Sequence, residues 1–205
     1  MTVPAVPPAP QLSALVGSRI CHDLIGPLGA IGNGIELLGL DGAGGGAELD
    51  LITQSVRNAH ARIRFFRIAF GAAAADARLG RPEIVAILAD LTATGRLKAD
   101  WHVPGDLPRR EVKLAFLALQ CLETAMPFGG RVTFSADARG WEARGRAPRL
   151  QPDPALWKLL EGTAAPEAAE LSAAQVQYAL LPLELARQQR RLTAELEDGA
   201  LRLRW

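Results

Sequence analysis

The chain has 205 residues, of which 49% are hydrophobic and 22% are charged, and its formal net charge at pH 7 is +1. This composition predicts a folded globular protein and lacks the strongly basic character of a dedicated nucleic-acid binder, so we expect no direct contact with nucleic acid. Its two cysteines lie in no CxxC or Cys/His spacing, and the sequence shows neither a run of about 18 apolar residues nor a signal-peptide pattern, so we expect a cytoplasmic protein that binds no membrane.

The N-terminal third of the sequence predicts a tail followed by two helices. Residues 1–10 contain four prolines and no charged side chain, which predicts a disordered tail. Residues 11–78 are predicted to form a helical hairpin that breaks at the glycine-rich residues 41–46. In both helices apolar residues recur at alternating spacings of four and three, the pattern of a narrow apolar face: Leu24, Leu28, Ile31, Ile35 and Leu38 in the first, and Ile52, Val56, Ala59, Ile63, Phe66 and Phe70 in the second.

Two such helices with a short link form an antiparallel hairpin. A single hairpin cannot cover both apolar faces together with the flanking Leu37, Leu40 and Phe65. We therefore expect two chains to pair as a homodimer whose centre is a four-helix bundle.

Residues 79–205 mix helical and strand patterns and predict an α/β second domain. Strands are expected where apolar residues alternate, and the Asp198-Gly199 pair predicts the turn of a C-terminal β-hairpin. The expected helices are 83–91, 111–126, 154–160 and 172–190, and the expected strands are 97–103, 131–136, 141–144, 192–196 and 201–205. The whole chain is thus predicted to have an α+β fold.

The first helix carries an unusual outward face. On an ideal helix, His22 lies about 160° from the centre of the apolar face, so we expect its imidazole to point away from the hairpin core. Gly26, Gly29 and Asn33 share this face, and each helical glycine reduces stability by about 0.8–1 kcal/mol relative to alanine. Pro27 removes one backbone hydrogen bond, which costs about 3 kcal/mol when nothing compensates. A bent helix with a nearly bare surface favours close approach of another protein; alternatively, the glycines permit tight helix packing.

His22 and Asp23 are the candidate catalytic residues. A neutral imidazole is a nucleophile that can attack phosphorus to form a labile phosphoramidate, so His22 is the candidate nucleophile. Asp23 points about 100° around the helix from His22, so helix geometry alone does not decide whether the two side chains form a direct hydrogen bond. Its carboxylate could favour the charged ring or orient a proton; alternatively, it is a solvated surface acid.

The segment His22-Asp23-Leu24-x-x-Pro27-Leu28-x-x-Ile31 resembles the H-box of the dimerisation and histidine-phosphotransfer hairpin of two-component histidine kinases. The longer run HDLIGPLGAIGNGIELL, residues 22–38, resembles the ChpT-type histidine phosphotransferases. The resemblance implies that His22 accepts a phosphoryl group, that Asp23 is the adjacent acid and that Pro27 kinks the helix. It also implies that residues 79–205 form an α/β sandwich related to the ATP-binding domain of histidine kinases.

Residues 120–132 resemble the N-box helix of these kinases and the strand after it, with two departures. Thr124 stands in place of the asparagine that binds the magnesium of the nucleotide, and Gln120 replaces another asparagine. No DxGxG motif follows Val132, and no later Gly-x-Gly loop could cradle phosphates. The resemblance therefore implies a degenerate domain without productive ATP binding. The protein then needs no cofactor of its own, because the partner receiver domain supplies Mg²⁺.

Candidate docking residues lie on both helices of the hairpin. On the second helix, the phase puts Arg57 and Phe65 away from the apolar face, and an acidic receiver pocket would accept guanidinium groups beside one exposed aromatic anchor. The alternative is that this charged face is only solvated. The full set of candidate docking residues is Ile25, Gly26, Gly29, Asn33, Arg57, Arg62 and Phe65.

The leading hypothesis is a homodimeric histidine phosphotransferase of a bacterial phosphorelay. Such an enzyme would accept a phosphoryl group from the receiver-domain aspartate of a hybrid histidine kinase onto His22 and pass it to the aspartate of a response regulator. One alternative is a divergent ATP-dependent histidine kinase module, which would bind ATP and phosphorylate itself. The other is a non-catalytic module that binds a response regulator, in which replacement of His22 would leave binding intact.

Overall fold

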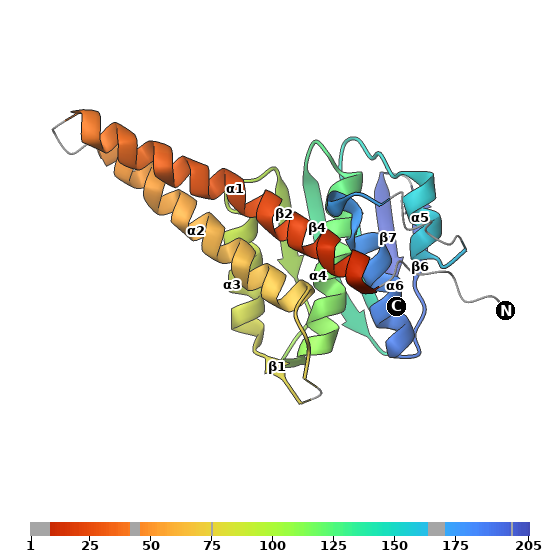
Figure 1. Cartoon of the computed structure of the whole chain (residues 1–205). Helices are drawn as coiled ribbons and strands as arrows, with labels where there is room; N and C mark the ends of the chain where they lie inside the picture. Colours follow the sequence, from red (N-terminus) through yellow and green to blue (C-terminus); the bar gives the residue numbers. More distant parts are fainter. Residues whose placement is uncertain (1–8, 42–45, 75, 164–170, 198) are drawn as a thin grey trace.

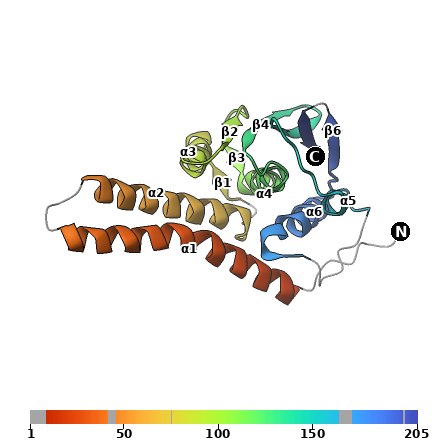
Figure 2. The same ribbon diagram turned by 90° about the horizontal axis from the view of Figure 1, so that it is seen from above.

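The computed structural model describes residues 9–41, 46–74, 76–163, 171–197 and 199–205. The fold is α+β, and Figure 2 shows three layers: a helical hairpin, a group of helices behind it, and a sheet. Most of the expected tail lies outside the described residues, but Ala9 and Pro10 already belong to the first helix. Residues 42–45 of the expected glycine-rich link also lie outside them.

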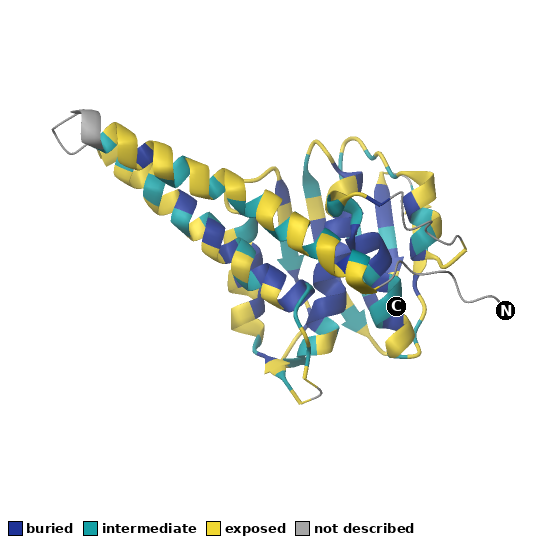
Figure 3. Cartoon of the chain, viewed as in Figure 1, coloured by how far each residue is buried: buried dark blue, intermediate teal, exposed yellow. Residues whose placement is uncertain are grey.

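The hairpin consists of α1 (Ala9–Asp41) and α2 (Gly46–Ala69) and projects as a long arm from the rest of the molecule (Figure 1). The two expected helices are confirmed, and α1 continues through Pro27 while changing direction partway along its length (Figure 2). The far half of the arm is mainly exposed, whereas the near half of α2 has a broad buried face (Figure 3). A large apolar surface of the arm is therefore left without a cover in the single chain.

The middle layer contains α3 (Arg81–Thr92), α4 (Arg109–Ala125) and α6 (Gln177–Arg187), together with the short α5 (Pro154–Leu160) and the 3-10 helix η1 (Ala173–Gln175). Every residue of α4 from Val112 to Leu122 is buried, because the hairpin covers one side and the sheet and α6 cover the others. The central helix α4 thus links the hairpin to the sheet.

The sheet has the strand order β2 (Leu97–Trp101), β4 (Gly130–Asp137), β5 (Gly140–Arg146), β7 (Ala200–Arg204) and β6 (Thr193–Glu197). The β2 and β4 strands are parallel, as a crossover through α4 requires, and the other pairs are antiparallel. Val132 and Phe134 face the helices, whereas Glu142 and Arg202 form an ion pair on the open face. Alternation of this kind is typical of a sheet that is covered on one side.

One small sheet was not predicted. The β1 strand (Arg78–Leu79) and β3 (Leu107–Pro108) form an antiparallel pair of only two residues each. Among the described residues, no helix combines the length and the apolar character needed to cross a membrane.

The hydrophobic core is continuous from the hairpin into the C-terminal part. Phe65, Phe66 and Ile68 of α2 belong to the same buried cluster as the inner faces of α3, α4 and the sheet. Phe65 is only 2% exposed, and its ring stacks on Phe116 of α4 with 4.6 Å between the ring centroids. The prediction that Phe65 is an exposed docking anchor is therefore wrong, because the face that points away from α1 packs against the C-terminal part.

Candidate functional site

His22 and Asp23 are neighbours on α1 with opposite environments. The His22 side chain is 85% exposed, in agreement with the expected outward orientation, whereas the Asp23 side chain is only 10% exposed. The imidazole Nδ1 lies 3.1 Å from Asp23 Oδ1. The hydrogen bond that the helix phase left open is therefore present.

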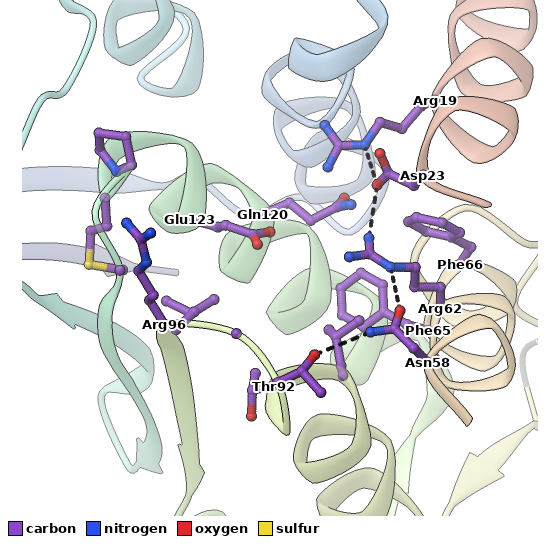
Figure 4. A pocket seen from close by; sticks show the side chains of 17 residues that line it. Arg19, Asp23, Asn58, Arg62, Phe65, Phe66, Thr92, Arg96, Gln120 and Glu123 are labelled. Atoms are coloured by element: carbon purple, nitrogen blue, oxygen red, sulfur yellow. Dashed lines mark hydrogen bonds and ion pairs between the residues drawn. The ribbon is translucent and has the colours of Figure 1, made fainter. Parts of the chain in front are cut away.

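Two arginines hold the carboxylate of Asp23 from the other side (Figure 4). Arg19 Nε donates to Asp23 Oδ2 at 2.9 Å from one turn earlier on α1, and Arg62 Nη1 donates to the same oxygen at 3.5 Å from α2. Arg62 Nε also donates to Asn58 Oδ1 at 2.9 Å. Asp23 is therefore not a solvated surface acid.

This arrangement determines which ring nitrogen of His22 carries the hydrogen. An ionised carboxylate only accepts hydrogen bonds, so the Nδ1 of His22 must be the donor to Asp23. In the neutral ring, the Nε2 atom then keeps a free lone pair. The imidazole consequently exposes Nε2 to solvent as a nitrogen nucleophile, while Asp23 holds Nδ1.

The surface beside His22 is bare, as the glycine pattern predicted. A Cβ placed on Gly26 or Gly29 would meet nothing within 4 Å, whereas a Cβ on Gly34 would lie 2.6 Å from Ile52 Cγ1 of α2. Ile25 is 68% exposed, and Asn33 is exposed as well. Within the chain, Gly34 is therefore a packing glycine, and Gly26 and Gly29 leave open surface around the imidazole.

A cavity of about 310 Å³ lies where the hairpin meets the C-terminal part. Asp23 and Arg62 line it from the hairpin, and Gln120 and Glu123 line it from α4 (Figure 4). Glu123 is an exposed residue at the opening of the cavity; partial loss of hydration raises the pKa of its carboxyl, while Arg19 and Arg62 oppose this rise. Two acidic side chains, Asp23 and Glu123, and the basic Arg19 and Arg62 therefore line the same cavity.

The candidate docking residues of α2 do not gather around His22. Arg62 is half-buried and engaged with Asp23 and Asn58, and Phe65 is in the core. Arg57 is exposed, but it lines a separate hollow, whose other residues are His60, Ile63, Arg64 and Asp90. The structure therefore brings Arg62 to the site from inside the fold and leaves Arg57 at a distance from the Asp23 cavity.

Sequence reasoning missed Arg19 and Asn58. Both lie four residues before a partner with which they interact, Arg19 before Asp23 and Asn58 before Arg62. This spacing places two side chains on the same face of a helix, so it could have indicated both pairs. The pairing of Arg62 with Asp23 is different, because it spans 39 residues and depends on the register of the hairpin.

The N-box-like positions on α4 are engaged within the chain. Thr124 Oγ1 donates to the backbone oxygen of Gln120 at 2.9 Å and accepts from Gln177 Nε2 of α6 at 3.0 Å. Gln177 is fully buried between these elements, and the hydroxyl of Tyr178 donates to the Cys121 backbone oxygen at 2.8 Å. The first turn of α6 therefore packs on the face of α4 that carries Thr124.

Comparisons with known proteins agree with one another. Residues 81–200 match the family model described as the histidine phosphotransferase C-terminal domain. The chain is 34% identical over 206 residues to the protein phosphotransferase ChpT of Brucella abortus (strain 2308), and the match covers 97% of each sequence. A solved structure of a bacterial phosphotransferase has 31% identity and a TM-score of 0.78, with 98% of each chain covered.

Proposed function

Because the chain belongs to the family of ChpT-type histidine phosphotransferases, we propose that it works in a bacterial phosphorelay and carries the phosphoryl group on His22. The observation that supports this assignment is the exposed imidazole of His22, with Nδ1 bound to a carboxylate and Nε2 open to solvent. The donor is the aspartyl phosphate of a receiver domain, as in a hybrid histidine kinase. The acceptor is the aspartate of a response regulator.

In the transfer step, the lone pair of His22 Nε2 attacks phosphorus in line with the phosphoaspartate bond. The N–P bond forms, the P–O bond breaks, and the receiver carboxylate leaves with the bonding electrons. The ring then carries positive charge while Nδ1 keeps its proton, and the adjacent Asp23 carboxylate stabilises that charge. The Mg²⁺ ion comes from the acidic pocket of the receiver, and the bare surface around Gly26 and Gly29 lets that pocket approach.

Phosphotransfer from a phosphorylated receiver domain tests the proposal. The chain has three histidines, so His22→Ala can be matched with His60→Ala and His102→Ala. All three histidines are exposed, so the three variants each remove an imidazole from the protein surface. We expect acid-labile, base-stable phosphate on the wild type and on both controls, and none on His22→Ala. Transfer to His22→Ala at the wild-type level would overturn the assignment.

We also propose that the protein does not use ATP productively. The hydroxyl of Thr124 donates to the Gln120 backbone oxygen and accepts from Gln177, so the position at which the resemblance expects a magnesium-binding asparagine holds a hydroxyl that is already engaged within the chain. We therefore expect no heat of binding when ATP and Mg²⁺ are titrated into the protein, and no phosphorylation from ATP alone. Autophosphorylation would instead favour the divergent kinase.

The working form in this proposal is a cytoplasmic homodimer. Leu28 and Ile35 of α1 are each 57% exposed in the single chain, and Ile63 of α2 is 49% exposed. These apolar side chains belong to the faces that the sequence predicts to be covered in a four-helix bundle. The hairpin of a second chain carries the same exposed apolar side chains and would cover them.

A further inference from the structure

We propose that Arg62 and Arg19 are positioning residues that fix which nitrogen of His22 attacks phosphorus, and that the C-terminal part of the chain braces both of them. This inference rests on the proposed function of His22 as phosphoryl carrier. It gives the C-terminal part a role in phosphotransfer that requires no nucleotide.

The first step is the division of labour between the two oxygens of Asp23. Oδ1 faces His22 Nδ1 at 3.1 Å, whereas Oδ2 accepts from Arg19 at 2.9 Å and from Arg62 at 3.5 Å. A carboxylate held in this way cannot rotate without breaking a contact to a guanidinium group. The Oδ1 atom therefore stays directed at the imidazole.

The second step is the anchoring of the arginines themselves, of which Figure 4 shows the bond between Arg62 and Asn58. Arg62 Nε donates to Asn58 Oδ1 at 2.9 Å, and Asn58 Nδ2 donates to Thr94 Oγ1, which follows α3, at 3.4 Å. Arg19 Nη1 donates to the backbone oxygen of Ala174 in η1 at 3.0 Å. Both paths from Asp23 therefore end in the C-terminal part, on two different segments.

The third step is the chemical consequence for the ring. A neutral imidazole exists in two tautomers, and only the tautomer with hydrogen on Nδ1 leaves the outer Nε2 with a lone pair. An oriented carboxylate at Nδ1 selects this tautomer, as the carboxylate does in a catalytic triad. If Asp23 were free to rotate, part of the population would carry hydrogen on Nε2 and would be unable to attack through that atom.

Asp23 is not the only acid near these arginines. Glu123 of α4 interacts electrostatically with Arg19, Arg62 and Asp23 across the cavity. When Glu123 is ionised, it competes with Asp23 for the two positive charges. The experiment is therefore run at one pH for all variants.

The variants for the test are Arg62→Ala, Arg62→Lys and Arg19→Ala, with Arg67→Ala as the control. Arg67 lies on the same helix as Arg62, but its side chain is 63% exposed and pairs only loosely with Glu83, at 3.9 Å. Nitrogen-15 NMR of the His22 ring reports the tautomer in the unphosphorylated protein, without any relay partner. Transfer kinetics from a phosphorylated receiver and the site of phosphate on the ring, Nε2 or Nδ1, complete the readout.

We expect wild type and Arg67→Ala to hold His22 with hydrogen on Nδ1 and to form phosphohistidine at Nε2 only. Arg62→Ala and Arg19→Ala should populate both tautomers and slow transfer roughly tenfold or more, and Arg62→Lys should recover part of the rate because it restores a positive charge near Oδ2. An unchanged tautomer ratio and an unchanged rate in both alanine variants would overturn the inference. If Arg62→Ala does not fold, Arg62→Lys and Arg19→Ala decide the question by the same readouts.

The two proposals fail in distinguishable ways. Transfer that survives in His22→Ala refutes the proposed function itself. Transfer that depends on His22 but is indifferent to Arg62 and Arg19 leaves that function intact and refutes only the positioning role.

Discussion

His22 and Asp23 are adjacent in sequence, yet their side chains are 85% and 10% exposed. The difference follows from their separation of about 100° around α1, which sends one toward solvent and the other toward α2. Catalysis by group transfer needs such a pair, because the nucleophile must be reachable and the residue that orients it must be fixed.

We expect Asp23→Asn to slow phosphotransfer about a hundredfold without preventing folding. The amide oxygen can accept a hydrogen bond from an arginine but carries no charge to pair with either guanidinium group, and the amide can turn its NH₂ group toward Nδ1 and so favour the wrong tautomer. The rate of transfer from a phosphorylated receiver measures the effect. Asp90→Asn is the matched control, since Asp90 is also paired with an arginine, Arg64, but lies on α3. Equal rates for Asp23→Asn and wild type would contradict the role given to Asp23.

The raised pKa of Glu123 makes a prediction about stability. Partial desolvation raises this pKa in the folded protein, so the ionised carboxylate is less favourable in the folded than in the unfolded chain. This penalty is present above the folded-state pKa and disappears below the ordinary value of 4.5, where the group is protonated in both states. We therefore expect Glu123→Gln to raise the Tm at about pH 7 and to change it much less at about pH 4. Glu161, an acidic residue outside the cavity, provides the control variant Glu161→Gln, and a lower Tm for Glu123→Gln near pH 7 would reverse the sign and reject the argument.

At the scale of single residues, the sequence indicated the proposed nucleophile and the adjacent Asp23, but not the arginines that pair with Asp23. His22 and Asp23 stand out because their motif lies within a few residues of one helix. The contact from Arg62 joins two helices, and the contact from Arg19 to Ala174 spans 155 residues. Such contacts depend on the packing of distant elements, which periodicity within one helix does not contain.

At the scale of elements, the error over Phe65 comes from treating α2 as a helix with one buried face. Ala59 and Phe66 lie on the apolar face that the spacing predicts, while Ala61 and Phe65 lie on another side of the helix and are buried as well, with Phe65 stacked on Phe116 of α4. Between them, Arg62 emerges at the cavity. A helix that packs on two neighbours has a broad buried arc, and the spacing of four and three residues identifies only one of its sides.

This packing gives a direct prediction for Phe65→Ala. Removal of a buried ring that stacks on Phe116 should reduce the free energy of unfolding by about 3–5 kcal/mol, as measured by denaturant titration. Ile25→Ala, at a position 68% exposed, should change it by less than about 0.5 kcal/mol. Phe65→Leu should keep most of the stability and the transfer rate, because the residue serves packing. A Phe65→Ala protein of wild-type stability that no longer binds a receiver would restore the docking interpretation.

The order and type of the larger elements were predictable, because each has a clear period and a turn signal at its ends. Helix α5 and the C-terminal strands occupy nearly the expected residues. The two-residue strands β1 and β3 were missed, because two residues are too few to show alternation. The expected helix 172–190 is divided into η1 and α6 and ends at Arg187.

At the scale of the whole molecule, two different surfaces of the hairpin need a cover. The near half of α2 is covered within the chain itself, because Phe65, Phe66 and Ile68 pack in the C-terminal core. The far half is not, and Figure 3 shows it as mainly exposed. The C-terminal part therefore fixes one end of the arm and leaves the remaining apolar surface of the arm uncovered in the single chain.

Four of the exposed apolar residues of the arm are spaced by seven residues or by twice that number. Leu28 and Ile35 follow this spacing on α1, and Leu49 and Ile63 are two such intervals apart on α2. Heptad spacing keeps side chains on the same side of a left-handed bundle, which is the geometry of two hairpins packed together. A charge placed in that interface would be buried without a partner, at a cost of several kcal/mol.

We therefore expect the wild type to elute with twice the mass of one chain in light scattering coupled to gel filtration, and Leu28→Glu combined with Ile63→Glu to elute as a monomer. Val85→Glu is the control, because Val85 is an exposed apolar residue of α3, outside the hairpin. Dilution should lower the Tm of the wild type and of the control, since dimerisation stabilises the folded state by mass action, but should not change that of the double variant. A wild type that is monomeric at all concentrations, or a double variant that stays dimeric, would show that the apolar rows of the arm have another purpose.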